Sequence, residues 1–255
     1  MELLFLGTCA CDYSPRLAGD LRDRFDKDAR RSSAVLLNGH ILIDCGDHVR
    51  DALRIAGVDE SRVTDIVVTH LHHDHFRADH VAAMAEKHPG LRLFVRWDAV
   101  LPTLPGVTVV RMQKMAPYDL GDGLFVTGLL ANHNEDAFPQ HLFFAGEDKT
   151  FLYGCDGAWM LHETYAWLFK KHLSLYVADA TCGDYAGDMR MAMHNSIPML
   201  RLMVPSMKTV GILTGESVVC LSHLAPSLHK PHDETVKIAA KEGWIVAYDG
   251  MTLHV

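Results

Sequence analysis

Long apolar runs are missing from this sequence of 255 residues. No stretch stays apolar over the roughly 20 residues needed to cross a bilayer, so we expect no membrane span. The first residues, MELLFLGTCACDY, carry no basic leader and run directly into a strand-like segment, which is unlike a signal peptide. Six cysteines in a chain of this length give no disulfide framework, and we therefore expect a cytoplasmic protein.

Positive charge is also scarce. The chain has 24 Lys and Arg against 32 Asp and Glu, which gives a formal net charge of −8. Proteins that hold nucleic acid by its backbone usually present a basic face, so we expect no large nucleic-acid partner. A small anionic substrate is still compatible with this charge, because bound cations can dominate the local field.

The sequence does contain alternating strand-like and helix-like segments. The dipeptide Asn38-Gly39 predicts a hairpin over residues 33–46, because these residue types suit a tight hairpin turn. Further hairpins are expected over residues 141–157 and 244–255, the last turning at Asp249-Gly250. Helices are expected over residues 47–56, 77–90, 158–172 and 232–243.

This mixture of connections sets the expected fold class. Tight turns join some neighbouring strands and helices join others, which predicts both antiparallel and parallel pairing. We therefore expect an α/β protein with two mixed β-sheets and helices on both outer sides. The sequence has no interior linker and no repeat, so residues 1–255 are expected to form one domain.

Histidine is in excess, with 17 in the chain, and four lie within VVTHLHHDHF, residues 67–76. His70 and His72 are two apart at the end of a predicted strand, where alternate side chains point the same way and can reach one ion. Asp74 and His75 are consecutive and diverge, which suits a second ion beside the first. The plain alternative for this segment is a solvated histidine-rich turn.

Three further titratable residues follow predicted strands far along the chain. His133 ends VTGLLANH, Asp156 ends FLYGCD and His223 ends VVCLSH. Each one alone is commonly an ordinary loop residue, but loops at strand ends often converge on a binding site. Two ions need more ligands than residues 70–75 offer, and the three residues together fill that need.

The segments THLHHDH, NH (132–133), CDG (155–157) and SH (222–223) resemble, in this order, the metal motifs of the metallo-β-lactamase fold superfamily. The resemblance implies an αββα sandwich with a site along one edge of the two sheets. It further implies that one ion is held by His70, His72 and His133, that a second is held by Asp74, His75 and His223, and that Asp156 bridges the pair.

These ligands predict the chemistry. Nitrogen and carboxylate ligands without a thiolate suit zinc or manganese, and iron is also compatible. A hydroxide held between two such ions is a strong nucleophile near neutral pH, so we expect a dinuclear metal-dependent hydrolase with Asp74 in its catalytic machinery. Asp44 and Asp179 are candidate acceptors for hydrogen bonds from the ligand histidines, or else capping and turn residues.

His194, in RMAMHNSI, matches the position where phosphodiesterases of the superfamily carry a histidine. As a second catalytic residue it could protonate the leaving alkoxide of a phosphodiester or bind its phosphate oxygens. The alternative is a residue at a helix entry, beside a capping Asn195 or Ser196. The resemblance favours a small phosphodiester substrate, cyclic ones included.

Within the superfamily, the chain most resembles the phosphoribosyl cyclic phosphodiesterases. Those proteins are expected to hold a structural zinc ion with an N-terminal cysteine cluster and a histidine shortly after the last metal ligand. Here only Cys9 and Cys11 are present and Pro226 takes the place of that histidine, so we predict no third metal ion.

Other functions remain open at this point. Lactonases and thioesterases share all of the metal motifs, and a metal-binding sensor without catalysis is a further alternative.

Arg30 and Arg31 could meet a substrate phosphate, although a solvated charge pair is the expectation. His229 and His232 could line the mouth of a pocket. Proteins with this core often dimerise, so we include a homodimer among the expectations.

Overall fold

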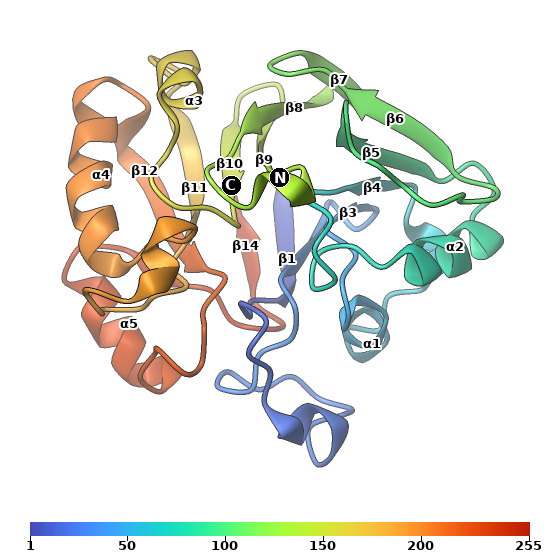
Figure 1. Cartoon of the computed structure of the whole chain (residues 1–255), viewed down its shortest axis with the longest axis horizontal. Helices are drawn as coiled ribbons and strands as arrows, with labels where there is room; N and C mark the ends of the chain where they lie inside the picture. Colours follow the sequence, from blue (N-terminus) through green and yellow to red (C-terminus); the bar gives the residue numbers. More distant parts are fainter.

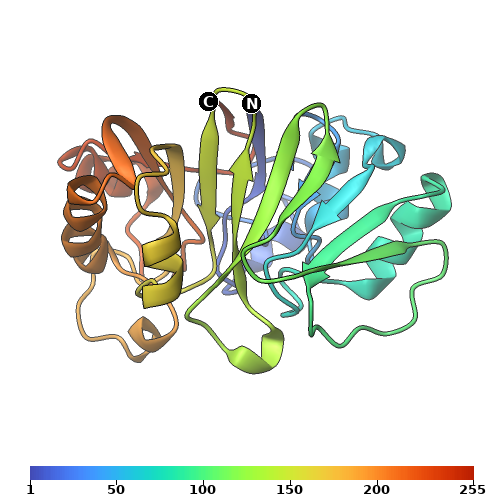
Figure 2. The ribbon, with the colours of Figure 1, turned by 90° about the horizontal axis from the view of Figure 1, so that it is seen from above.

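Two β-sheets lie face to face at the centre of the molecule, and helices cover the outer side of each (Figures 1 and 2). The computed structural model describes residues 1–255. The first sheet has the strand order β14-β1-β2-β3-β4-β5-β6 and the second has the order β13-β12-β11-β10-β9-β8-β7. This is the predicted αββα sandwich of two mixed sheets.

The strands of the first sheet are β1 (Glu2–Gly7), β2 (Ala34–Leu37), β3 (Ile41–Ile43), β4 (Asp65–Val67), β5 (Arg92–Arg96), β6 (Thr108–Met112) and β14 (Thr252–His254). Those of the second sheet are β7 (Pro117–Gly121), β8 (Leu124–Leu130), β9 (Gln140–Ala145), β10 (Thr150–Gly154), β11 (Leu173–Asp179), β12 (Leu213–Ser222) and β13 (Ile245–Val246). Helices α1 (Val49–Ile55) and α2 (Ala78–Lys87) cover the first sheet, whereas α3 (His162–Trp167), α4 (Ile197–Thr209) and α5 (His232–Ala240) cover the second. None of the helices combines the length and the apolar composition that crossing a bilayer requires.

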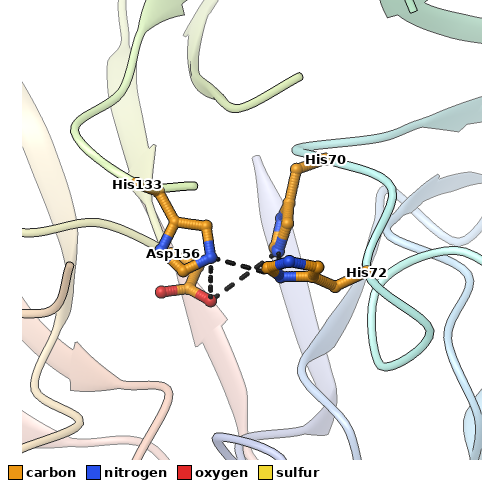
Figure 3. Close-up of side chains that lie close together, drawn as sticks. All are labelled: His70, His72, His133 and Asp156. Atoms are coloured by element: carbon orange, nitrogen blue, oxygen red, sulfur yellow. Dashed lines mark hydrogen bonds and ion pairs between the residues drawn. The ribbon is translucent and has the colours of Figure 1, made fainter. Parts of the chain in front are cut away.

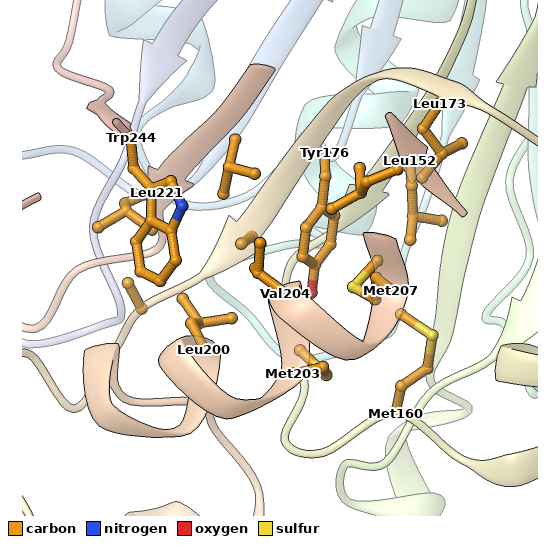
Figure 4. Close-up of a cluster of buried hydrophobic side chains, with 14 of the residues drawn as sticks. Leu152, Met160, Leu173, Tyr176, Leu200, Met203, Val204, Met207, Leu221 and Trp244 are labelled. Atoms are coloured by element: carbon orange, nitrogen blue, oxygen red, sulfur yellow. The ribbon is translucent and has the colours of Figure 1, made fainter. Parts of the chain in front are cut away.

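Alternating side chains of the central strands divide the core into layers. Leu175 and Val177 of β11 point between the two sheets, whereas Tyr176 between them points outward to the helices. The outer layer on this side packs α4 residues such as Leu200 against the sheet, as Figure 4 shows. A third cluster lies between the first sheet and helices α1 and α2. Strands buried on both faces explain why the apolar runs of the sequence are short and continuous rather than alternating with polar residues.

Two predicted hairpins are confirmed. Strands β2 and β3 pair antiparallel, with Leu37 opposite Ile41, and both residues of the Asn38-Gly39 turn have positive φ angles. Strands β9 and β10 also pair antiparallel, around the turn near residues 147–149. Short local connections of this kind are well determined by the residues of the turn itself.

The predicted C-terminal hairpin is wrong. Strand β13 pairs with β12 in the second sheet, whereas β14 pairs with β1 in the first. The segment between them crosses from one sheet to the other. Asp249 is buried there and accepts hydrogen bonds from the Thr8 hydroxyl at 2.9 Å and from the Arg31 backbone N–H at 2.7 Å. The turn at Asp249-Gly250 does form, since the Met251 N–H donates to the Tyr248 carbonyl at 3.0 Å, but these long-range contacts place the strands on either side of it in different sheets.

The predicted helix over residues 158–172 is too long, because α3 covers only His162–Trp167. Residues 158–161 instead form a loop, whose Ala158 N–H donates to the Asn132 carbonyl. Helix α4 and strand β7 are additional elements that the sequence prediction omitted. The Ser196 hydroxyl caps α4 by accepting from the Met199 N–H at 3.3 Å, so the capping role suggested for Ser196 is correct.

One edge of the sandwich collects the ends of six strands. Strands β3 and β4 run parallel in the first sheet, and β10, β11 and β12 run parallel in the second. Strand β8 points the same way as β10, since both are antiparallel to β9 between them. The loops after these strands therefore meet at one edge, as expected for ligand sites in sheets with parallel strands.

Gly46 allows two of these loops to approach closely. A Cβ atom added to Gly46 would lie 1.7 Å from the Asp74 carbonyl oxygen, which is backbone and cannot rotate away. We expect Gly46→Ala to lower the free energy of unfolding by about 3 kcal/mol or more, measured by urea denaturation. Gly215→Ala is the control, since its added Cβ would have no atom within 4 Å. Equal stability of the two variants would contradict this packing.

Candidate metal centre

The segment after β4 forms a tight turn that carries the histidine cluster. The His72 carbonyl accepts the N–H groups of His75 at 2.9 Å and of Phe76 at 2.7 Å. The returning chain is fixed against the loop after β3, because the Cys45 N–H donates to the His75 carbonyl at 2.7 Å. His70 and His75 are buried in this turn. We call residues 69–76 the histidine turn.

His70, His72 and His133 form the first group of ligand atoms (Figure 3). Nδ1 of His72 lies 2.9 Å from Nε2 of His70 and 3.2 Å from Nε2 of His133. His133 comes from the loop after β8, 61 residues further along the chain than His72. The structure therefore brings together the three residues predicted for one ion.

Asp74, His75 and His223 form the second group. Nε2 of His75 lies 3.3 Å from Oδ2 of Asp74 and 3.1 Å from Nε2 of His223. His223 follows β12 and has a positive φ of 55°, a backbone conformation that turns the chain sharply at this point. The three residues predicted for the second ion thus also lie together.

Asp156 lies between the two groups. Its Oδ2 atom is 3.7 Å from Nε2 of His70 and 3.5 Å from Nε2 of His133, which belong to the first group. The same oxygen is 3.4 Å from Nε2 of His223 and 4.0 Å from Nε2 of His75, which belong to the second. One carboxylate oxygen therefore faces both groups, as a bridging ligand would.

The separations around Oδ2 of Asp156 fit a metal site better than a set of hydrogen bonds. Nitrogen–oxygen hydrogen bonds are about 2.7–3.2 Å long, so no imidazole nitrogen around Oδ2 of Asp156 is within that range. Two ligand atoms about 2.1 Å from one ion at a tetrahedral angle lie about 3.4 Å apart. The nitrogen and carboxylate donors are the types that zinc, manganese and iron accept. The residues present thus fit a pair of divalent ions.

The opposite nitrogen of four of the five rings also has a partner. Nδ1 of His133 donates to the Met193 carbonyl at 3.2 Å, and Nδ1 of His75 donates to Asp44 Oδ2 at 2.7 Å. Nδ1 of His70 is 3.0 Å from the Thr69 hydroxyl, and Nδ1 of His223 is 2.8 Å from the Thr181 hydroxyl. A proton on Nδ1 leaves the Nε2 lone pair free for a metal ion.

Two buried aspartates orient these rings, each together with one threonine. The Thr69 hydroxyl donates to Asp44 and the Thr181 hydroxyl donates to Asp179. Asp44 accepts further from the Thr69 N–H at 2.7 Å, and Asp179 accepts the N–H groups of Thr181 and Asn195 at 2.9 and 3.0 Å. The structure thus places Asp44 and Asp179 as hydrogen-bond acceptors behind the histidines.

His194 lies beside the second group. Its Nδ1 is 2.6 Å from Oδ1 of Asp156 and 3.2 Å from Oδ2 of Asp179. The ring is largely buried and stacks on His223, with ring centres 5.6 Å apart. The two carboxylates lie against Nδ1, so Nε2 is on the side of the ring away from them.

Burial and neighbouring charges set the pKa values of these groups in opposite directions. Burial and the surrounding imidazoles hold the pKa of His70 well below its usual value, so this ring is neutral and can act as a ligand. Burial alone would lower the pKa of His194, but Asp156 and Asp179 outweigh it and raise that pKa to about 10. The carboxyl group of Asp156 has a lowered pKa because His223 and His194 outweigh its burial.

Other candidate residues lie elsewhere. Arg30 and Arg31 are not a solvated pair: Arg30 donates to the Ala247 carbonyl at 2.7 Å, Arg31 donates to the Leu21 carbonyl at 2.7 Å, and both are buried. Buried guanidinium groups need hydrogen-bond acceptors, and the bond from Arg30 to Ala247 connects the N-terminal loop with the segment after β13.

The two histidines considered for a pocket mouth have partners of their own. His229 lies against the Ala180 carbonyl, 2.7 Å away, and His232 is buried against Arg30.

Sequence reasoning missed three residues that support the site. Thr69 and Thr181 each touch two histidines, and the Asn195 amide donates to the Gly157 carbonyl at 3.0 Å, which fixes the loop after Asp156. Thr69 adjoins His70, and Thr181 lies two residues after Asp179. Their positions beside candidate residues were the available signal, but a lone hydroxyl in a sequence has many ordinary roles.

Residues 25–88 match the family model described as Anti-Pycsar protein Apyc1. This segment includes Asp44 and the whole histidine turn, but none of the later candidate ligands. A search of curated proteins found no match to the chain.

Solved structures similar to this one extend the likeness over the whole chain. YhfI from Bacillus subtilis, a metallo-β-lactamase fold protein, has a TM-score of 0.74 at 15% identity, covering 99% of this chain and 98% of that one. Zn²⁺-bound PqqB from Methylobacterium extorquens has a TM-score of 0.73 at 16% identity, with both chains fully covered. The short form of human tRNase Z has a TM-score of 0.69 at 17% identity, covering 100% and 99%. At these identities the likeness shows the fold.

Proposed function

We propose that this chain, which has the metallo-β-lactamase fold, is a metal-dependent hydrolase that cleaves a small phosphodiester. His70, His72 and His133 would hold one divalent ion, Asp74, His75 and His223 would hold the other, and Asp156 would bridge them. Ions bound there would activate water and stabilise charge on the attacked phosphorus. The convergence of four imidazole nitrogens on Oδ2 of Asp156 supports this assignment.

The position of His194 carries the choice of a phosphodiester. Such a substrate is an anion and has an alkoxide as a poor leaving group, so its cleavage benefits from cations and from a proton donor. The carboxylates of Asp156 and Asp179 fix Nδ1 of His194, which aims the other ring nitrogen away from them. His194 can therefore deliver a proton from Nε2 to the departing oxygen.

Carbonyl hydrolysis is the second candidate. Lactones and thioesters are neutral, so a pair of cations contributes less to binding them than to binding an anion. A thiolate also departs without a proton, so a proton-donating histidine is less needed for a thioester. The net charge of −8 argues against a long polyanion as substrate, even though tRNase Z shares the fold. A small cyclic or linear phosphodiester is compatible both with a proton-donating histidine and with the negative net charge of the chain.

Parallel assays test this choice. Protein loaded with manganese or zinc is expected to hydrolyse bis(p-nitrophenyl) phosphate and a small cyclic phosphate. Rates with a p-nitrophenyl ester and with a lactone are expected to be at least about tenfold lower in kcat/KM, about 1.4 kcal/mol in transition-state free energy. Turnover of the ester or lactone without turnover of either phosphate would show that the second candidate is correct.

A substitution of Asp44 tests whether its hydrogen bond to His75 contributes to metal affinity. Asp44→Asn removes the carboxylate that accepts from His75 Nδ1, and we expect manganese affinity to fall about 10–100-fold while the fold is kept. Isothermal titration with manganese measures this. Asp51→Asn is a control from the helix that follows this loop, because Asp51 is exposed and paired with Arg54. Unchanged affinity in Asp44→Asn would contradict the assigned role.

A further inference from the structure

A second kind of donor lies just outside the two groups already described. Cys11 is the only exposed cysteine of the six, and its Sγ lies 3.6 Å from Nε2 of His73. Both atoms also lie within 4.8 Å of a carboxylate oxygen of Asp74. The His73 side chain is 62% exposed and points away from the neighbouring histidines of the turn, as expected for its place between two ligands.

The His73 ring is already oriented for a metal ion. Its Nδ1 donates to Asp47 Oδ2 at 2.6 Å, which leaves the Nε2 lone pair facing Cys11. Asp47 is itself held in place by Arg77 Nη1 at 3.0 Å. A histidine whose far nitrogen donates to a fixed carboxylate is the usual arrangement behind a metal ligand.

The spacing of the two donors fits one tetrahedral ion. A zinc ion about 2.3 Å from sulfur and about 2.05 Å from nitrogen, at a tetrahedral angle, requires a separation of about 3.6 Å. This equals the Sγ–Nε2 distance in the structure. The loop that carries Cys11 is also fixed independently, because the Ala10 N–H donates to the Leu224 carbonyl at 3.1 Å and Asp12 Oδ2 accepts from the Ser227 N–H at 2.9 Å.

In contrast to the sequence-based expectation of no third metal ion, we propose that Cys11, His73 and Asp74 form a third metal site, next to the dinuclear one and selective for a thiolate-binding ion such as zinc. The Cys11 thiol loses its proton to solvent when the ion binds, and the sulfur forms the new bond as a thiolate. Asp74 is shared with the second group of the dinuclear site. The bound ion fastens the N-terminal loop to the histidine turn. This site does not depend on which bond the protein hydrolyses.

Cobalt substitution tests the site directly. None of the seven residues assigned to the dinuclear site is a thiol, so a thiolate-to-cobalt charge-transfer absorption in the near ultraviolet reports only Cys11. We expect this absorption in the wild-type protein, and we expect Cys11→Ser and His73→Ala to lose it. The same variants are expected to bind two zinc ions per chain where the wild type binds three.

Two matched variants serve as controls. Cys9→Ser removes a buried thiol of the same loop, and His254→Ala removes an exposed histidine far along the chain. Both are expected to keep the absorption and the third zinc ion. An absent absorption in the wild type, or one that survives in Cys11→Ser, would overturn the proposal.

A second readout does not require an altered cysteine. Zinc is expected to slow alkylation of Cys11 by iodoacetamide at least about tenfold in the wild-type protein, because the thiolate is engaged. The same addition is expected to have no effect on His73→Ala. Equal alkylation rates with and without zinc in the wild type would contradict the site, whatever the hydrolysis assays show.

Discussion

Replacing Asp156 with alanine is expected to reduce manganese binding from two ions to fewer than one per chain. It is also expected to lower hydrolysis of bis(p-nitrophenyl) phosphate by at least about 10³-fold, about 4 kcal/mol in the barrier. The reason is that one oxygen of Asp156 faces four imidazole nitrogens of both groups. Its removal is therefore expected to affect both ions together.

Elemental analysis after gel filtration and a steady-state assay measure these two effects. Asp148→Ala is the matched control, because Asp148 lies in the exposed turn at the far end of the same β9–β10 hairpin. The control is expected to keep two manganese ions and wild-type rates. If Asp156→Ala kept two ions and more than a tenth of the activity, Asp156 would not be a bridging ligand.

Replacing His194 with alanine is expected to give a different pattern, with loss of activity and no loss of metal. His194 contacts Asp156 only through its Nδ1 and is not placed among the seven ligands. We expect kcat for a phosphodiester with an alkoxide leaving group to fall about 10²–10⁴-fold, the usual contribution of a general acid. Manganese content is expected to stay near two per chain.

The leaving group distinguishes the two roles of His194. A p-nitrophenolate is stable without a proton, so a general acid predicts less than about a tenfold loss with bis(p-nitrophenyl) phosphate. A residue that only binds phosphate oxygens predicts the same loss with both substrates, mainly in KM. His162→Ala, at an exposed position at the start of α3, is the control and is expected to behave as wild type. Full activity of His194→Ala on the alkoxide substrate would remove His194 from the mechanism.

The parts of the fold that the sequence predicted well depend on local signals. Asn38-Gly39 determines the β2–β3 hairpin because few residues accept two consecutive positive φ angles. The histidine turn was recognisable as a candidate site for a similar reason, since its titratable residues lie within six positions. His133, Asp156 and His223 were harder to identify, and only their common position after strands and the order of the resembling motifs connected them to the turn.

The errors arose where distant contacts decide the structure. The buried hydrogen bonds of Asp249 to Thr8 and Arg31 carry the chain from one sheet to the other, and no local pattern reports them. The same contacts bury Arg31, which the sequence alone placed in solvent. Cys11 and His73 are 62 residues apart, so their proximity could be found only from the folded chain.

An anomalous-scattering map from crystals grown with manganese is the most direct test of the central claim. Manganese is suitable because it prefers nitrogen and oxygen ligands to thiolates, so the Cys11 site is not expected to compete. The account predicts two peaks about 3.5–4 Å apart, one beside His70, His72 and His133 and the other beside Asp74, His75 and His223. A map with no peak, or with a single peak away from Asp156, would contradict it.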